Sequence, residues 1–253
     1  MIPYWHFAQI PLGPITIQMW GFFVALGILV ALLVASRAVR KIGVQSSVVW
    51  DIGFWVVLAG FVGARLGHVF FYDWEFFQTH PSEILRVWHG GFSSFGGFAG
   101  AALAGILLLR RIPVHRWQFA DAMILGVPLG WAIGRIGCFL IHDHPGTLTH
   151  FLLGVKYPDG VRHDLGLYDL INAALLAVAL FLFRKPLQRY PGAALAMVAI
   201  WYGTVRFFLD FLRAYDTRYF GFTPAQYGSL IMAIMGIWMV IKIRRNPQPP
   251  TAV

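Results

Sequence analysis

The 253-residue sequence is poor in charged residues and contains one cysteine. Lys, Arg, Asp and Glu make up 12% of the chain, whereas soluble domains carry about 25%. Together with a hydrophobic content of 58%, this shortage excludes a water-soluble globule of this length. The lone Cys138 excludes an internal disulfide and a cysteine-rich metal site.

Apolar stretches long enough to cross a bilayer, about 17–25 residues each, occur seven times. They are expected near residues 15–39, 48–71, 91–109, 119–141, 167–183, 192–212 and 225–243. Because the connections are short, the sequence predicts an all-α polytopic membrane helix bundle with seven transmembrane helices in one domain, residues 1–245. No strands are expected. Residues 246–253, which include three prolines, are predicted to form a disordered cytoplasmic tail.

No charged residue precedes Arg37, so the basic leader of a secretory signal is lacking and the first segment is expected to remain as a helix. The net charge of +9 is unevenly distributed. Twelve Lys and Arg residues follow odd-numbered segments and five follow even-numbered ones. The positive-inside rule therefore predicts an outer N-terminus and a cytoplasmic C-terminus. The same pattern argues against a nucleic-acid partner.

The three remaining basic residues, Arg65, Arg135 and Arg206, fall inside or at the ends of predicted segments, toward their outer half. A charge at membrane depth costs about 2.5–3.5 kcal/mol on insertion scales, so it normally faces a partner or a wet cavity. Structural ion pairs are the alternative for each arginine alone. Three arginines at one depth make that alternative less suitable. Gly134 and Gly137 leave room around Arg135, which favours a phosphate site there, because a guanidinium binds phosphate through two parallel hydrogen bonds. Snorkelling of Arg135 to the interface is the alternative.

Several local patterns surround these arginines. Arg206, Asp210 and Arg213 share one helical face, so Asp210 can bridge the two arginines, either for binding or as a plain salt-bridge ladder. The glycine-rich stretch 90–97 predicts a tight turn whose N–H groups could bind an anion. Small residues at Gly96 and Gly100, and at Gly126, Gly130 and Gly134, are spaced for close helix contact.

Two connections on the outer side differ in polarity. Residues 72–90 mix aromatic and polar side chains, which predicts a short amphipathic segment at the outer interface, with a substrate gate as the alternative. Residues 142–166 form the longest outer loop, and their polarity beside a buried arginine makes them a candidate site. His142 and His144 are too close in sequence to share a helix face, so a metal site is not favoured.

Taken in order, these segments resemble the bacterial prolipoprotein diacylglyceryl transferases over about residues 20–243. The fourth segment ends in residues 134–146, GRIGCFLIHDHPG, similar to the family's G-R-I-G-N-F-x-N-x-E-x-x-G. The second ends in residues 63–72, GARLGHVFFY, similar to G-G-R-I-G-Y-V-x-F-Y. In the sixth, Arg206, Asp210 and Arg213 resemble R-x-x-x-E-x-x-R.

The resemblance implies transfer of a diacylglyceryl group from phosphatidylglycerol to the lipobox cysteine of a prolipoprotein signal peptide. Glycerol phosphate is released, and the family works without a cofactor in the bacterial plasma (inner) membrane, as a multi-pass protein. The catalytic residues expected here are Arg135, His142, Asp143, Arg206 and Asp210. The substrate-binding residues expected are Arg65, His68, Ser93, Ser94, Gly96, Gly97, Arg135, Gly146, Arg206 and Arg213.

The sequence departs from the family pattern at several positions. A family histidine regarded as the base is Phe95 here, and two signature asparagines are Cys138 and Ile141. We hypothesise that another histidine supplies the base, His142 first and His68 second. Cys138 as a nucleophile is a further alternative to its reading as a small apolar residue.

These departures leave two rival functions open. A non-catalytic or substrate-shifted paralogue would bind phospholipid and act as a scaffold or regulator. A small-solute transporter ranks last, because no inverted repeat is visible.

Overall fold

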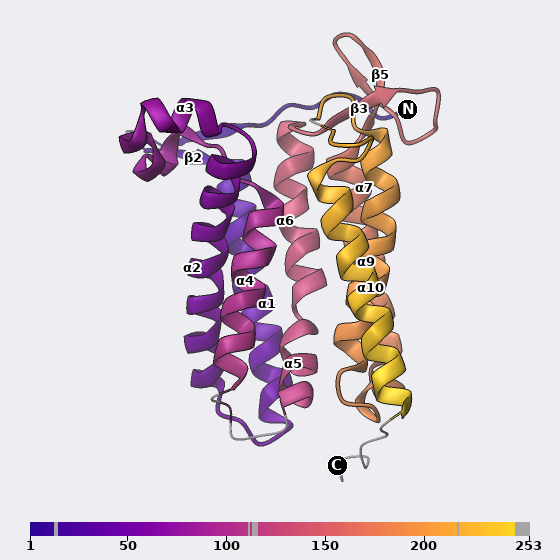
Figure 1. Ribbon diagram of the computed structural model, residues 1–253. Coiled ribbons are helices and arrows are strands. Elements are labelled where there is room, and N and C mark those ends of the chain that lie inside the picture. Colours follow the sequence, from indigo (N-terminus) through magenta and orange to yellow (C-terminus); the bar gives the residue numbers. More distant parts are fainter. Residues whose placement is uncertain (13–14, 111, 113–115, 217, 246–253) are drawn as a thin grey trace. The chain divides into compact units, whose positions relative to one another are not determined.

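The computed structural model describes residues 1–12, 15–110, 112, 116–216 and 218–245 (Figure 1). Its longer helices are α1 (Met19–Arg40), α2 (Ser46–Phe71), α4 (Ser94–Leu109), α5 (Arg116–Ile124), α6 (Val127–Ile141), α7 (Leu165–Leu182), α9 (Ala193–Leu209) and α10 (Pro224–Arg245). Short helical turns are α3 (Trp74–Thr79), η1 (Pro81–Leu85), η2 (Val87–His89), α8 (Arg184–Gln188) and η3 (Asp210–Leu212). The strands are β1 (Gln9–Leu12), β2 (Ile15–Gln18), β3 (Pro145–Leu148), β4 (Val155–Tyr157) and β5 (Gly160–Asp164).

Six helical segments among the described residues are long and apolar enough to cross a membrane, with α5 and α6 together forming one of them. The predicted helical, multi-pass membrane fold is therefore confirmed. The seventh expected span corresponds to α4, which has 16 residues and is shorter than these six. The count of seven and the orientation stay predictions.

The helices expose large apolar side chains, as a lipid-facing surface requires. Leu182 is 67% exposed, Phe208 is 64% exposed and Leu103 is 60% exposed. Hydrocarbon accepts such side chains, while the helices satisfy their own backbone hydrogen bonds.

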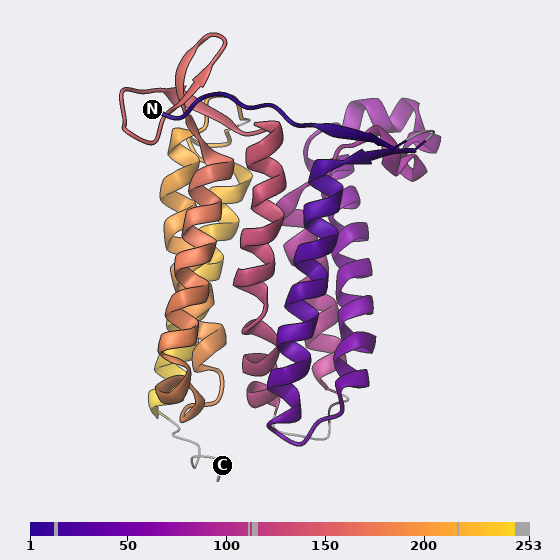
Figure 2. The same ribbon diagram turned by 180° about the vertical axis from the view of Figure 1, so that it is seen from behind.

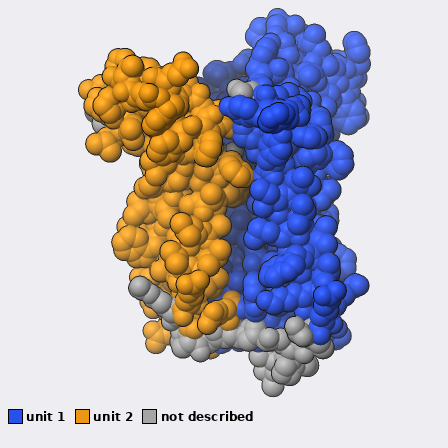
Figure 3. Space-filling view, in the orientation of Figure 1, with its two compact units in different colours: residues 1–42, 117–253 blue, residues 43–116 orange. Residues whose placement is uncertain are grey.

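The chain falls into two compact units, coloured separately in Figure 3. Unit 1 comprises Met1–Ile42 and Trp117–Val253, and unit 2 comprises Gly43–Arg116. The expectation of a single domain over residues 1–245 stays a prediction. The expected tail at 246–253 lies outside the described residues.

In unit 1, α1 packs on α6, α6 on α7, α7 on α9 and α9 on α10 (Figures 1 and 2). The contact between α1 and α6 is close because glycines meet there. A Cβ built on Gly130 would lie 2.4 Å from the carbonyl oxygen of Gly27, and one on Gly126 would lie 2.2 Å from that of Ala31. The predicted packing role of Gly130 in α6, and of Gly126 directly before it, is confirmed.

In unit 2, α2 packs against α4. A Cβ on Gly96 would lie 2.3 Å from the carbonyl oxygen of Gly63, and one on Gly100 would lie 2.3 Å from that of Ala59. Both glycines thus permit a backbone contact that a larger residue would block. The connection 72–90 folds into α3, η1 and η2. Its placement as an amphipathic segment at the outer interface stays a prediction.

The expectation of no strands was wrong. The presumed loop 142–166 forms an antiparallel sheet in the order β3-β5-β4, and β1 pairs with β2 in a hairpin before α1. The N-terminal segment joins this sheet, because Ile2 N donates to Gly154 O and Lys156 N donates to Ile2 O. Strands of three to five residues are too short to show a period in the sequence. We call the end of unit 1 that carries β3–β5 the sheet end (Figure 2).

Candidate active site

A carboxylate joins arginines from two helices inside unit 1. Arg206 Nη1 on α9 lies 2.7 Å from Asp169 Oδ2 on α7, and Arg135 Nη2 on α6 lies 3.0 Å from the same oxygen. The Asp169 side chain is 0% exposed, and those of Arg206 and Arg135 are 6% and 11% exposed. Three helices therefore converge at one buried acid.

The ion pairs continue along the end of α9. Arg206 Nη2 lies 3.0 Å from Asp210 Oδ1, and Arg213 Nε lies 3.1 Å from the same oxygen. Arg213 Nη1 also bonds Asp216 Oδ2 at 2.9 Å. The predicted bridging of two arginines by Asp210 is confirmed. We call this set the charged ladder, with members Arg135, Asp169, Arg206, Asp210, Arg213 and Asp216.

The charged ladder balances three guanidinium groups with three carboxylates. Such balance is needed because an unpaired charge at this depth is costly, and removal of one partner of a buried pair typically costs about 3–5 kcal/mol. The balance is incomplete in hydrogen bonding, since Asp169 Oδ1 is buried without a partner among the described residues. A buried acceptor left so costs about 1–3 kcal/mol.

Arg135 is the ladder arginine with contacts toward the end of α6. Its guanidinium carbon lies 5.0 Å from the centre of the Trp131 ring, and Nη1 donates to Cys138 Sγ at 3.6 Å. Asp169 and Tyr202 are further partners of the same guanidinium. A ligand contact of Arg135 would therefore use the N–H groups that these partners and Cys138 leave.

His142 ends α6 in a left-handed conformation, with φ of 50°. Its Nδ1 lies 2.5 Å from Asp164 Oδ2, to which Tyr157 also donates at 2.8 Å. Burial and the neighbouring Asp164 charge raise the pKa of Tyr157, so its hydroxyl stays a donor. The His142 side chain is 1% exposed and stacks on Tyr4. This network joins α6 to α7, and the catalytic role of His142 stays a prediction that its burial disfavours.

Asp143 and His144 follow at the surface of the sheet end. Asp143 Oδ1 and His144 Nδ1 are hydrogen-bonded, with side chains 33% and 24% exposed. Ligand-type atoms of Cys138, Asp143 and His144 lie within 4.8 Å of one another, a spacing that would also suit a metal ion. The nearby Arg135 guanidinium opposes a cation electrostatically. The expectation of no metal stays a prediction.

Gly146 lies where the sheet meets the end of α9. It pairs with Arg213 in an isolated bridge, and a Cβ on it would lie 2.8 Å from both His163 Cβ and Leu212 O. Only a glycine permits this approach, so the residue fixes β3 beside the charged ladder. Its predicted substrate-binding role stays a prediction.

Unit 2 uses its arginine differently. Arg65 donates to the backbone carbonyl oxygens of a turn-rich segment, which are those of Glu83, Ile84, Arg86, Gly90 and Gly91. Its guanidinium also lies 5.1 Å from the centre of the Phe77 ring. His68 Nε2 pairs with Asp73 Oδ2 at 3.0 Å. Both residues organise the connection 72–91, and their substrate contacts stay predictions.

The glycine-rich motif begins α4. Ser93 Oγ accepts a hydrogen bond from Gly96 N at 3.2 Å, which caps the helix. A Cβ on Gly97 would lie 3.4 Å from Ala64 Cβ, an ordinary contact. The side chain of Ser94 lies outside the described residues. Helix capping and packing explain this motif locally, and anion binding there stays a prediction.

Sequence reasoning missed two members of this region as site residues, Asp169 and His144. An acid within an apolar segment is itself a signal of an intramembrane partner, and Asp169 carried that signal. Its two arginine partners lie 34 and 37 residues away in the sequence, so their convergence was not readable from it.

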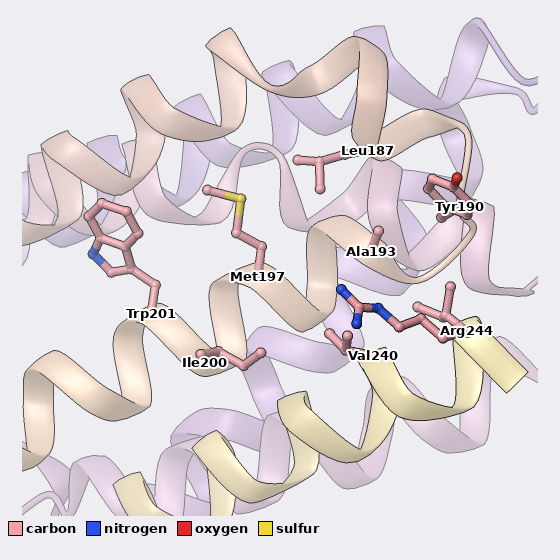
Figure 4. A pocket seen from close by; sticks show the side chains of 9 residues that line it. Leu187, Tyr190, Ala193, Met197, Ile200, Trp201, Val240 and Arg244 are labelled. Atoms are coloured by element: carbon pink, nitrogen blue, oxygen red, sulfur yellow. The ribbon is translucent and has the colours of Figure 1, made fainter.

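An apolar groove of about 770 Å³ lies elsewhere in unit 1, along α8, α9 and α10. Figure 4 shows its lining, with Met197, Leu187 and Trp201 on one side and Arg244 near its end. No member of the charged ladder lines it.

Fold and site together define a multi-pass membrane protein with a buried, charge-balanced arginine cluster that joins α6, α7 and α9. The family model for prolipoprotein diacylglyceryl transferase matches residues 7–242. The chain therefore belongs to this transferase family.

Three curated relatives carry the name phosphatidylglycerol–prolipoprotein diacylglyceryl transferase. The protein of Staphylococcus saprophyticus is 33% identical, with 92% of this chain and 87% of the relative covered. That of Staphylococcus xylosus is 32% identical with the same coverage. That of Staphylococcus aureus is 30% identical, with 94% and 89% covered.

Proposed function

We propose that this protein transfers a diacylglyceryl group from phosphatidylglycerol to the lipobox cysteine of a prolipoprotein signal peptide, in the bacterial plasma (inner) membrane. The observation that carries the proposal is the convergence of Arg135 and Arg206 on the buried Asp169. Membership of the transferase family and the names of the relatives support the same reaction.

The reaction forms a bond between the acceptor sulfur and a glyceryl carbon and breaks the bond from that carbon to a phosphate ester oxygen. The electron pair of the broken bond stays on the phosphate of the leaving glycerol phosphate. A fixed guanidinium beside that oxygen stabilises the charge as it develops. Arg135 suits this role because it is the ladder arginine that reaches beyond the buried carboxylates toward Cys138.

Other ladder members act through Arg135. Asp169 holds its guanidinium, Arg206 shares that carboxylate, and Asp210 holds Arg206 in turn. We assign Arg206, Asp210 and Arg213 as positioning residues on this basis. The proposal keeps substrate contacts for Arg65, His68, Ser93, Gly96, Gly97 and Gly146.

The test uses purified full-length protein with phosphatidylglycerol and a synthetic lipobox peptide. Mass spectrometry of the peptide should show the gain of one diacylglyceryl group on the cysteine. Arg135→Ala should reduce the rate about 100-fold or more, since removal of one such donor typically costs 10²–10³ in rate. Arg135→Lys keeps the positive charge but loses the planar guanidinium, so its rate should lie between those of wild type and Arg135→Ala.

A matched control is Arg184→Ala, because Arg184 lies on α8 against Phe181 and outside the ladder. It should keep the wild-type rate. Absence of transfer, with phosphatidylglycerol binding that Arg135→Ala removes, would instead support a non-catalytic phospholipid-binding paralogue. Absence of both transfer and lipid binding would contradict the proposal.

A further inference from the structure

A histidine–carboxylate pair lies beside the charged ladder, and the proposed function has not used it. Asp143 and His144 follow α6 directly, and their functional atoms lie within 4.8 Å of Cys138 Sγ. Cys138 Sγ in turn accepts from Arg135. Cys138 is therefore the side chain that lies between this pair and the Arg135 guanidinium, which we assign to the phosphate.

The proposed reaction requires a base at this place. A thiol attacks as its thiolate, and a free cysteine has a pKa of about 8.5, so a neutral solution holds little of the reactive form. Histidine is the side chain best suited to accept that proton near neutral pH. The base acts on the attacking sulfur and the guanidinium acts on the departing oxygen, so the two groups must flank the same glyceryl carbon from opposite sides.

We propose that His144, oriented by Asp143, takes the proton of the acceptor thiol during transfer. This inference rests on the proposed function and adds a catalytic residue to it. Sequence reasoning placed His142 first and His68 second in this role and did not assign it to His144.

The hydrogen bond between the two side chains fixes the imidazole for this task. Nδ1 of His144 faces the Asp143 carboxylate, so Nδ1 carries the proton and Nε2 is left as the acceptor. Within the described part of the chain, Nε2 has no hydrogen-bond partner. The His144 side chain is 24% exposed, so an acceptor peptide can reach it. A base that is oriented by a carboxylate is a general arrangement for activating a nucleophile.

The other histidines of the sheet end are less suited. His142 has its Nδ1 on Asp164 and a side chain that is 1% exposed, so a peptide cannot reach its ring without opening the network around Tyr4. His163 Nδ1 bonds the Tyr168 hydroxyl at 2.8 Å, and burial lowers its pKa.

The titratable and charged groups that face His144 come from the turn after α6, from α6 itself and from α7. Asp143 is its direct partner, and Cys138 and Arg135 contribute from α6. Asp169 interacts with it electrostatically from α7. The two carboxylates favour the imidazolium that forms during the reaction, while Arg135 opposes it.

The atoms balance without a co-reactant. The thiol proton moves to Nε2 of His144, and the sulfur forms its bond to the glyceryl carbon. The carbon–oxygen bond breaks with its electron pair on the phosphate oxygen, and glycerol phosphate leaves. The imidazolium then releases its proton to water, which restores the neutral base.

The experiment measures kcat/KM for the lipobox peptide against pH in wild type, His144→Gln and Asp143→Asn. Wild type should lose rate at acidic pH, because a protonated imidazole cannot accept the thiol proton. His144→Gln should be about 100-fold slower at pH 7 and should lack that acidic limb, because a general base contributes about 10²–10⁴ in rate. Asp143→Asn should move the limb to lower pH, because the carboxylate that stabilises the imidazolium is removed.

A selenocysteine lipobox peptide separates a base from a structural residue. A selenol ionises more readily than a thiol, so it needs less help from a base. His144→Gln should therefore recover most of its lost rate with this peptide while keeping phosphatidylglycerol binding. His150→Gln, a histidine change in the connection after β3, is the matched control and should behave as wild type.

The outcomes separate the two proposals. A wild-type protein without transfer overturns the proposed function and, with it, the role of His144. If wild type is active and His144→Gln keeps the acidic limb of the pH profile, the role of His144 is overturned. The proposed function is not. An equal defect of His144→Gln toward both peptides likewise overturns it, because a merely structural residue would not distinguish thiol from selenol.

Discussion

The two units of this protein each bury arginine in an apolar helix region, yet they supply different partners. In unit 1, Arg135 and Arg206 share the carboxylate of Asp169. In unit 2, Arg65 donates to backbone carbonyl oxygens of the segment 83–91, and no ion pair holds it among the described residues. Carboxylates cancel the charge of a guanidinium, whereas carbonyls satisfy its N–H groups and leave the charge in place.

The sequence alone grouped Arg65 with Arg135 and Arg206 as one set of buried arginines, whereas the structure gives Arg65 different partners. A balanced ladder holds several guanidiniums in fixed orientations at a tolerable cost in a buried place. An arginine bound to carbonyls keeps a full positive charge and fixes the position of the segment that carries those carbonyls, here residues 83–91. Under the proposed function, the first arrangement orients guanidinium groups for the reaction, whereas the second holds the segment 83–91 against α2.

The largest effect is expected from Asp169→Asn, which removes the shared carboxylate. Arg135 and Arg206 would then lack their common partner, so we expect a loss of about 3–5 kcal/mol in stability and at least a 100-fold drop in transfer. Thermal unfolding in detergent and the peptide assay measure both. Asp159→Asn, which breaks the exposed pair with Arg162, is the control. Equal behaviour of the two variants would show that the ladder is not the centre of the site.

A smaller effect is expected from changes at Arg65. Arg65→Lys keeps the charge but loses the fork that reaches several carbonyls, while Arg65→Gln loses the charge. If the residue mainly anchors the connection, both variants should expose residues 83–91 to protease and lower transfer about 10-fold. If Arg65→Gln loses phosphatidylglycerol binding and Arg65→Lys keeps it, the positive charge of Arg65 binds the lipid instead.

The packing of unit 2 offers a third, smaller test. Gly96→Ala places a methyl group against the carbonyl oxygen of Gly63, whereas Gly105→Ala in the same helix meets nothing within 4 Å. Overpacking costs about 1–3 kcal/mol, so Gly96→Ala should unfold at lower temperature. Gly105→Ala should be neutral or slightly stabilising, because alanine favours a helix over glycine. The reverse order would contradict the α2–α4 contact.

The smallest effect concerns pH at the sheet end. Burial lowers the pKa of His163 below its unfolded value of about 6.5, so protonation favours the unfolded state. The contribution to stability is complete above pH 6.5 and is lost as the pH falls below it toward the folded pKa. Unfolding temperatures from pH 7.5 to pH 5 should therefore decline more in wild type than in His163→Gln. Parallel curves would remove His163 as the cause.

The sequence by itself determined the membrane-spanning class of the protein. Long apolar runs have one stable solution in lipid, and intrahelical hydrogen bonding makes that solution local. The bridge from Asp210 to its two arginines was equally local, because residues one turn apart share a helix face.

Only the tertiary structure decided which groups meet. Asp169 joined Arg135 to Arg206 through the packing of α6, α7 and α9, a relation between distant segments that no spacing encodes. The β3–β5 sheet placed His142 inside and His144 at the surface, although the two are separated by one residue. Burial and approach depend on the folded neighbours, and therefore the roles of these two histidines could not be read from their order in the chain.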